Sequence, residues 1–114
     1  MQTIPEAQTS VIRHRFCSTD ELYREQRITH WVDALGDEIT AVYIRETIYV
    51  VSSVCPHFGG VLEVDPRQCQ FRCLWHDWRF DISTGNCVTY DVKTNLRHYP
   101  YEITPDGWLE IISK

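Results

Sequence analysis

The sequence predicts a small antiparallel all-β domain, and two observations support that class. Runs rich in β-branched and aromatic residues recur at short intervals, and turn-forming residues separate them. No segment keeps an apolar period of 3.6 residues over three helical turns. Because 43% of the 114 residues are hydrophobic, the chain can bury one modest core. We therefore expect a single domain built of short strands.

The expected elements can be placed by residue number. Residues 1–15 are expected to be an N-terminal lead-in, and residues 16–114 to form the single domain. A short helical turn is expected at 18–22, where Ser18 or Thr19 can cap it. The predicted strands cover residues 28–32, 39–45, 48–53, 70–73, 79–81, 88–90, 99–103 and 108–112.

Turn signals separate these strands. Glu46-Thr47 is the only spacer between two β-branched runs, which predicts a tight hairpin there. Pro105-Asp106-Gly107 is a strong turn tripeptide and predicts a second hairpin between the last two strands. Gly36-Asp37 and residues 83–86 mark two further turns.

The charge balance argues against nucleic-acid binding, because 16 acidic and 11 basic residues give a net charge of −5. Neutralising phosphates requires clustered Lys and Arg, and the basic cluster at 13–15 is short. No apolar run approaches the roughly 18 to 20 residues that cross a bilayer. The first 16 residues lack the apolar segment of a secretory signal. We expect a cytoplasmic monomer with neither a nucleic-acid nor a membrane partner.

Five cysteines are many for a chain of this length, and an odd number argues against a disulfide framework. Two of them stand in short loops that also carry histidine. The first loop pairs Cys55 with His57, and the second pairs Cys73 with His76. The remaining thiols and histidines are expected to be packing or surface residues. They are Cys17, Cys69, Cys87, His14, His30 and His98.

The mixed ligand types within each loop indicate the kind of metal centre. One tetrahedral zinc could bind two Cys and two His, but structural zinc sites usually group like ligands at short spacing. Here each loop can give its Cys to one iron and its His to another. Thiolate suits iron–sulfur clusters, and two His replacing two Cys on one iron is the ligand set of a Rieske centre. Zinc remains the alternative.

The stretches CPHFGG, from residue 55, and CLWHDWRFDISTG, from residue 73, resemble the Rieske family, and the likeness covers about residues 16–112. The resemblance implies three small antiparallel sheets and a cluster-binding tip made of the two loops. It also implies one Rieske-type [2Fe-2S] cluster held by Cys55, His57, Cys73 and His76. Within the family, the chain is most similar to the soluble Rieske-type ferredoxins of multicomponent oxygenase systems.

That resemblance implies an electron-transfer component of an oxidoreductase system, not an enzyme. Its partners would be an NAD(P)H-dependent flavin reductase and a terminal oxygenase. An oxygenase itself would need a second iron held by two His and a carboxylate, and nothing after residue 76 offers that set. The alternatives are a small Rieske subunit of a larger complex, such as a nitrite reductase, and a zinc-stabilised interaction module.

Departures from the cytochrome bc-type branch of the family concern four positions. That branch has an extra Cys in each loop, forming a disulfide; the matching positions here are Gly60 and Trp75. It also places a Ser and a Tyr hydroxyl near the cluster, where this chain has Trp78 and Phe80. We therefore expect no disulfide clasp and a reduction potential towards the lower end of the Rieske span.

The docking face is expected at the tip, as the resemblance implies. Phe58 and Trp78 are the candidate apolar contacts, and Asp77 and Glu63 are the candidate acidic groups. A net charge of −5 favours partners with basic patches around their redox centres.

Overall fold

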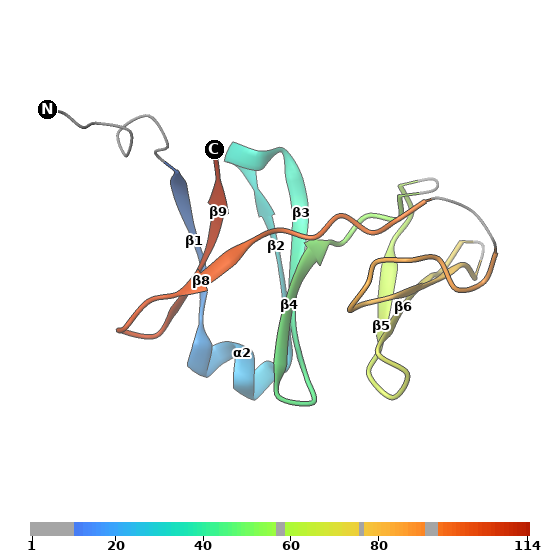
Figure 1. The fold of residues 1–114 in the computed structure, drawn as a ribbon, viewed down its shortest axis with the longest axis horizontal. Helices are drawn as coiled ribbons and strands as arrows, with labels where there is room; N and C mark the ends of the chain where they lie inside the picture. The colour runs from blue at the N-terminus through green and yellow to red at the C-terminus, as the bar shows by residue number, and fades with distance from the viewer. Residues whose placement is uncertain (1–10, 57–58, 76, 91–93) are drawn as a thin grey trace, which may run out of the picture.

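The computed structural model describes residues 11–56, 59–75, 77–90 and 94–114. Its described residues form three three-stranded antiparallel sheets and two short helical segments (Figure 1). The elements in chain order are β1 (Ile12–Ser18), α2 (Thr19–Glu25), β2 (Arg27–Val32), the 3₁₀ helix η1 (Asp33–Leu35), β3 (Asp37–Ile44), β4 (Thr47–Ser52), β5 (Leu62–Asp65), β6 (Gln70–Cys73), β7 (Arg79–Asp81), β8 (Tyr101–Ile103) and β9 (Trp108–Ser113). The predicted all-β class is confirmed.

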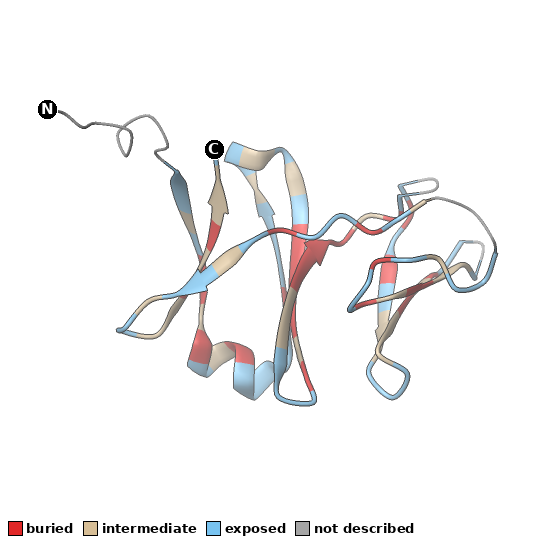
Figure 2. Cartoon of the chain, viewed as in Figure 1, coloured by how far each residue is buried: buried red, intermediate tan, exposed pale blue. Residues whose placement is uncertain are grey.

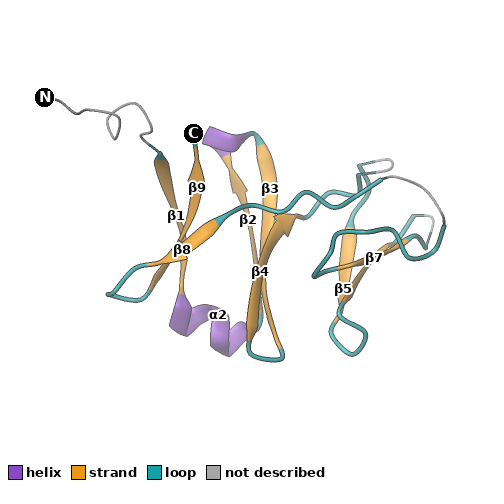
Figure 3. Cartoon of the chain, viewed as in Figure 1, coloured by secondary structure: helices purple, strands orange, loops and turns teal. Residues whose placement is uncertain are grey.

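The sheets are connected in a simple way. Their strand orders are β1-β9-β8, β2-β3-β4 and β5-β6-β7, and every strand pair is antiparallel. The third sheet is inserted between β4 and β8 and lies to one side of the other two (Figure 1). Its strands are short, and long irregular segments lead into it from β4 and out of it to β8 (Figure 3). Because the third sheet lies beside the other two, the molecule is elongated, with principal extents of 55 × 32 × 24 Å.

The middle sheet, β2-β3-β4, separates two hydrophobic cores. Alternate residues of a strand point to opposite faces, so β3 places Ile39 and Ala41 in the first core and Val42 and Ile44 in the second. Strand β4 divides in the same way, and both strands are largely buried (Figure 2). The first core packs against β1, α2 and β9, and the second reaches under the third sheet.

Local signals explain why the elements begin and end where they do. Helix α2 begins after Ser18, whose Oγ accepts a hydrogen bond from the Glu21 amide at 3.1 Å, as the capping prediction required. The β3–β4 hairpin is also confirmed, but its two turn residues are Arg45 and Glu46, one position earlier than expected. Both have positive φ, 52° and 66°, which is the geometry of the turn that suits a two-residue hairpin.

Two strands differ from the expected pattern. Strand β1 begins at Ile12, within the expected lead-in, because pairing with β9 places Arg13 and Arg15 beside Glu110. Strand β5 was not predicted, since its four residues carry two acidic side chains. In the described part of the chain, no helix is long and apolar enough to span a membrane.

The predicted strand at 88–90 is wrong. Val88 donates its amide to the Arg79 carbonyl at 2.8 Å, so the segment does meet the edge of β7. The Arg79 amide, however, donates to the Thr89 hydroxyl at 2.6 Å and not to a backbone carbonyl. A side chain thus occupies the position of the next ladder bond, and strand pairing stops there.

Candidate metal centre

The two loops that carry the candidate ligands lie at the same end of the third sheet. Cys55 lies in the connection between β4 and β5, and Cys73 is the last residue of β6. Both side chains are buried, with exposed fractions of 1% and 0%. His57, Phe58 and His76 lie outside the described residues. The structure therefore places two of the four predicted ligands, and both belong to the second core.

The two loops have the same backbone hydrogen-bond frame. In the first loop the Cys55 amide donates to the Gly60 carbonyl at 2.9 Å, and the Gly59 amide donates to the Cys55 carbonyl at 2.7 Å. In the second loop Cys73 donates to the Trp78 carbonyl at 2.7 Å, and Asp77 donates to the Cys73 carbonyl at 2.8 Å. Each cysteine is thus held by the fourth and fifth residues after it. Each loop can present its cysteine in the same way.

The fourth residue of each frame adopts a left-handed backbone. Gly59 has a φ of +76°, which glycine adopts without steric cost, while Asp77 has a φ of +56°. Such a φ is uncommon for other residues, although Asp and Asn are enriched there. The second loop therefore makes the same left-handed turn with an aspartate that the first loop makes with a glycine.

Direct contacts join the two loops. The Leu74 amide donates to the Val61 carbonyl at 3.1 Å. A Cβ atom added to Gly60 would lie 2.9 Å from Cδ2 of Trp75, so the indole packs directly on the Gly60 backbone. Gly60 and Trp75 match the two cysteines that form a disulfide in the cytochrome bc-type branch. Here the two residues are in van der Waals contact. Trp75 keeps 63% of its surface exposed.

A polar clamp holds the chain that leads into the first loop. Ser52 Oγ donates to Asp37 Oδ1 at 3.1 Å, and Ser53 Oγ donates to Glu38 Oε1 at 2.8 Å. The Ser53 amide also donates to the Glu38 carbonyl at 2.8 Å, which extends the pairing of β3 beyond the end of β4. Both serines are buried. The approach to the candidate ligand is therefore fixed by side chains as well as by backbone.

Tyr99 completes this clamp from the C-terminal part of the chain. Its hydroxyl donates to Asp37 Oδ2 at 2.6 Å, so this carboxylate binds both a serine and a phenol. Burial, together with the bond to Asp37, raises the pKa of Tyr99 to about 12. The segment after the third sheet is thereby tied to the start of β3. Sequence reasoning did not identify this clamp.

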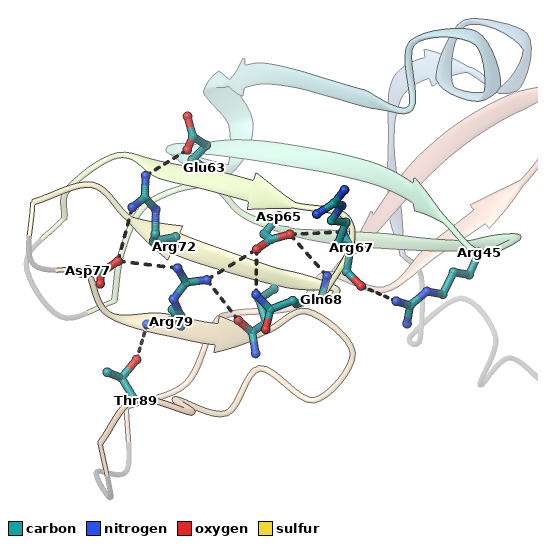
Figure 4. Close-up of polar contacts among 10 residues, drawn as sticks. Arg45, Glu63, Asp65, Arg67, Gln68, Arg72, Asp77, Arg79 and Thr89 are labelled. Carbon is teal, nitrogen blue, oxygen red and sulfur yellow. Dashed lines mark hydrogen bonds and ion pairs between the residues drawn. The ribbon is translucent and has the colours of Figure 1, made fainter.

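A row of ion pairs lies on the exposed side of the third sheet (Figure 4). Arg72 on β6 contacts Glu63 Oε1 at 3.3 Å and Asp77 Oδ1 at 3.5 Å. Arg79 on β7 contacts Asp65 Oδ2 at 3.5 Å and Asp77 Oδ1 at 3.9 Å. Asp77 and Glu63, the expected docking acids, are thus both paired with arginine.

The other cysteines lie outside the two loops. Cys17 is buried in the first core, and burial, with Glu21 nearby, raises the pKa of its thiol to about 11. Cys69 and Cys87 pack against the second core, and burial raises the pKa of Cys69 as well. Among the described residues there is no disulfide and no group of three or more side chains arranged to hold a metal ion.

Comparisons with known proteins agree with this arrangement. The sequence pattern of the Rieske [2Fe-2S] domain matches residues 13–100. The ferredoxin component of the naphthalene 1,2-dioxygenase system of Pseudomonas putida is 27% identical over 71 residues, which cover 60% of this chain and 66% of that protein. The chain spans between 17% and 66% of the length of the curated relatives it matches.

Solved structures share the fold. The ferredoxin of carbazole 1,9a-dioxygenase from Nocardioides aromaticivorans superposes with a TM-score of 0.72 at 22% identity, covering 90% of this chain and 98% of that one. An NADH-dependent nitrite reductase small subunit from Mycobacterium tuberculosis, described as putative, superposes with a TM-score of 0.68 at 17% identity, covering 92% and 97%. At these identities, the likeness shows a common fold.

The Tyr99–Asp37 bond predicts a specific alkaline instability. The pKa of Tyr99 is raised from 10.0 to about 12 on folding. The protonated phenol therefore stabilises the folded state fully below pH 10, and this contribution to the free energy of unfolding is lost as pH rises toward 12. Tyr99→Phe should lower the free energy of unfolding at neutral pH by about 1.5–3 kcal/mol. It should also flatten the loss of stability above about pH 10. Urea unfolding at several pH values measures both, with the exposed Tyr23→Phe as control. Equal alkaline slopes in wild type and Tyr99→Phe would contradict the assignment.

The Gly60–Trp75 contact predicts a coupled pair of substitutions. Gly60→Ala should destabilise the protein by about 1–3 kcal/mol, because its methyl group must displace the indole. In a Trp75→Ala background, the same change should cost less than about 0.5 kcal/mol, since the obstructing ring is gone. Unfolding free energies of the two single variants and the double variant give the coupling. Strict additivity would show that the two residues do not touch.

Proposed function

The chain belongs to the Rieske [2Fe-2S] domain family, and from that premise we propose that it is a one-electron carrier. It would take electrons from an NAD(P)H-dependent flavin reductase and pass them to a terminal oxygenase. The observation that carries the proposal is the pair of loops, which present two buried cysteines in one hydrogen-bond frame. Cytoplasmic location and a monomeric state remain predictions from the sequence.

The described residues fit a Rieske-type cluster, which is the cofactor of the family. Cys55 and Cys73 are buried, lie outside any disulfide, and occupy equivalent positions in adjacent loops. Two thiolates presented in this way suit one iron of a [2Fe-2S] pair, and two imidazoles suit the other. We assign Cys55 and Cys73 to the first role, and His57 and His76 to the second from their positions in the sequence.

The protein contributes rigidity and shielding to electron transfer. When bound, the cluster supplies a one-electron couple, and the surrounding chain sets its environment. The Asp37 and Glu38 clamp fixes the approach to Cys55, while the frame around Cys73 fixes the second loop. Phe80, fully buried on β7, contributes no hydroxyl to this region. A potential at the lower end of the Rieske span stays a prediction from the sequence.

The docking face can be drawn more closely than the sequence allowed. Val61, Leu74 and Trp75 are 59%, 48% and 63% exposed, and all three come from the two ligand loops. Large apolar side chains left in solvent beside a redox site favour brief contact with a partner. Of the two apolar contacts expected from the sequence, Trp78 is less exposed than these three residues, and Phe58 lies outside the described residues. We therefore assign the apolar part of the docking face to Val61, Leu74 and Trp75.

The oxygenase partner rests on the names of the relatives. Ferredoxins of naphthalene and carbazole dioxygenases are among the proteins that this chain resembles. A second candidate function is a fixed subunit of a larger oxidoreductase complex. The structural likeness to a nitrite reductase small subunit makes the fold compatible with this function. A zinc-stabilised interaction module is the third.

The ligand assignment predicts the spectrum of the purified protein. Wild type should contain two irons and show the absorption and electron paramagnetic resonance of a Rieske cluster. Cys55→Ser and Cys73→Ser should both lose iron and spectrum, and should unfold more easily because metal binding and folding are coupled. Cys87→Ser, outside the loops, is the matched control and should keep both. Stoichiometric zinc without iron would refute the carrier and support the zinc module.

The carrier proposal also predicts a salt effect. Weak redox encounters bury less than about 1,200 Å² and use charge steering for speed. Raising ionic strength from about 0.05 to about 0.5 M shortens the Debye length about threefold, so reduction by the partner reductase should slow. Stopped-flow reduction kinetics and gel filtration at both salt concentrations measure the rate and the complex. A complex that co-elutes at fixed stoichiometry in high salt would instead establish the fixed subunit.

A further inference from the structure

The two ligand loops differ at one position of their common frame. Gly59 and Asp77 are each the fourth residue after a candidate cysteine, and both have positive φ, at 76° and 56°. Glycine adopts this conformation freely, whereas an L-residue meets a steric penalty. An additional interaction can therefore stabilise the second loop in a conformation that the first loop adopts without one.

The carboxylate of Asp77 supplies that interaction. One of its oxygens, Oδ1, lies 3.5 Å from the Arg72 guanidinium and 3.9 Å from the Arg79 guanidinium (Figure 4). The two arginines come from neighbouring strands and stand directly opposite each other in the β6–β7 register. The carboxylate thus links the loop to two neighbouring strands of the sheet.

The arginines are themselves held in place. Arg72 also contacts Glu63, its register partner on β5, and Arg79 also contacts Asp65 on the same strand. Like charges directly opposite each other in a sheet repel, so Arg72 and Arg79 need an acid near both. Asp77 Oδ1 meets that need, because both guanidinium groups contact it. From β5 to the loop, acidic Glu63, basic Arg72 and acidic Asp77 therefore alternate.

We propose that Asp77 is a positioning residue for the second ligand loop. Its ion pairs with Arg72 and Arg79 stabilise the left-handed turn that closes the frame between Cys73 and Trp78, directly after His76 in the sequence. The effect of this turn on cluster retention rests on the proposed function. The effect on the loop itself does not, and the two are measured separately.

Hydrogen exchange of the full-length protein as purified tests the loop. In peptides covering residues 72–80, Asp77→Asn should exchange about two- to fivefold faster than wild type, the effect expected from losing exposed ion pairs. Asparagine tolerates the left-handed backbone, so only the charge is removed. At about 1 M salt, wild type should approach the variant, while the variant should change less, because only the pairs of Arg72 with Glu63 and of Arg79 with Asp65 remain to be screened. Glu25→Gln removes a remote charge paired with Arg24 and should match wild type throughout.

Further variants separate charge from backbone conformation. Asp77→Ala loses the carboxylate and a side chain suited to positive φ, so its loop should exchange faster than that of Asp77→Asn. Arg72→Gln should reproduce part of the Asp77→Asn effect, and combining the two should add less than their sum. If Asp77→Asn matches wild type while Asp77→Ala alone is faster, only conformation matters and the ion-pair role is overturned. Wild-type exchange in Asp77→Asn and Asp77→Ala alike overturns it too.

Cluster retention gives the functional arm of the test. Loss of the cluster absorption in excess chelator should be about two- to fivefold faster in Asp77→Asn than in wild type or Glu25→Gln. Equal rates in all three would show that the turn does not affect the cluster, and would overturn that part. A wild-type protein without iron would instead refute the proposed function, and the exchange experiment would still decide the role of Asp77.

Discussion

The hydrogen bonds on either side of Cys55 and Cys73 are the constraint on which the rest of the domain depends. Each cysteine donates its amide to the fifth residue after it and accepts from the fourth, so each loop is closed by its own backbone. Closed loops of this kind can bury a thiol and still leave neighbouring side chains at the surface. The third sheet, the interloop contact of Gly60 with Trp75 and the clamp around Asp37 all hold these two loops together.

The two hydrophobic cores lie on opposite faces of the middle sheet. Because β3 and β4 alternate their side chains between both cores, a change in one core is felt through the same backbone that borders the other. Cys55 and Cys73 are themselves members of the second core. The candidate centre is therefore built into the packing of the domain. The loops gain rigidity from buried aliphatic and aromatic side chains, such as Val51 and Phe71.

The sequence predicted the features that depend on local signals. The β3–β4 hairpin, the Ser18 cap and the two loops were found because each is encoded by a few consecutive residues. Strand β5 was missed because its four residues carry little apolar pattern, and they become a strand only by pairing with β6. Residues 88–90 were wrongly predicted as a strand because their local pattern is β-branched. In the structure, the Thr89 hydroxyl accepts the hydrogen bond of the Arg79 amide, where strand pairing requires a backbone carbonyl. The Ser52–Asp37 and Arg72–Asp77 contacts depend on strand register and loop path, which no local signal reveals. The ligand roles of His57 and His76 stay predictions.

The pairing of β1 with β9 has a kinetic consequence. Ile12 lies opposite Ser113, so the outer sheet joins segments from opposite ends of the described chain. In contrast, β5, β6 and β7 follow one another as a meander whose contacts span few residues. Local contacts form faster than distant ones, because closing a long loop costs more chain entropy. During synthesis, the sheet that ends in Cys73 and follows the Cys55 loop can therefore assemble before β9, the last strand of the outer sheet, has been synthesised.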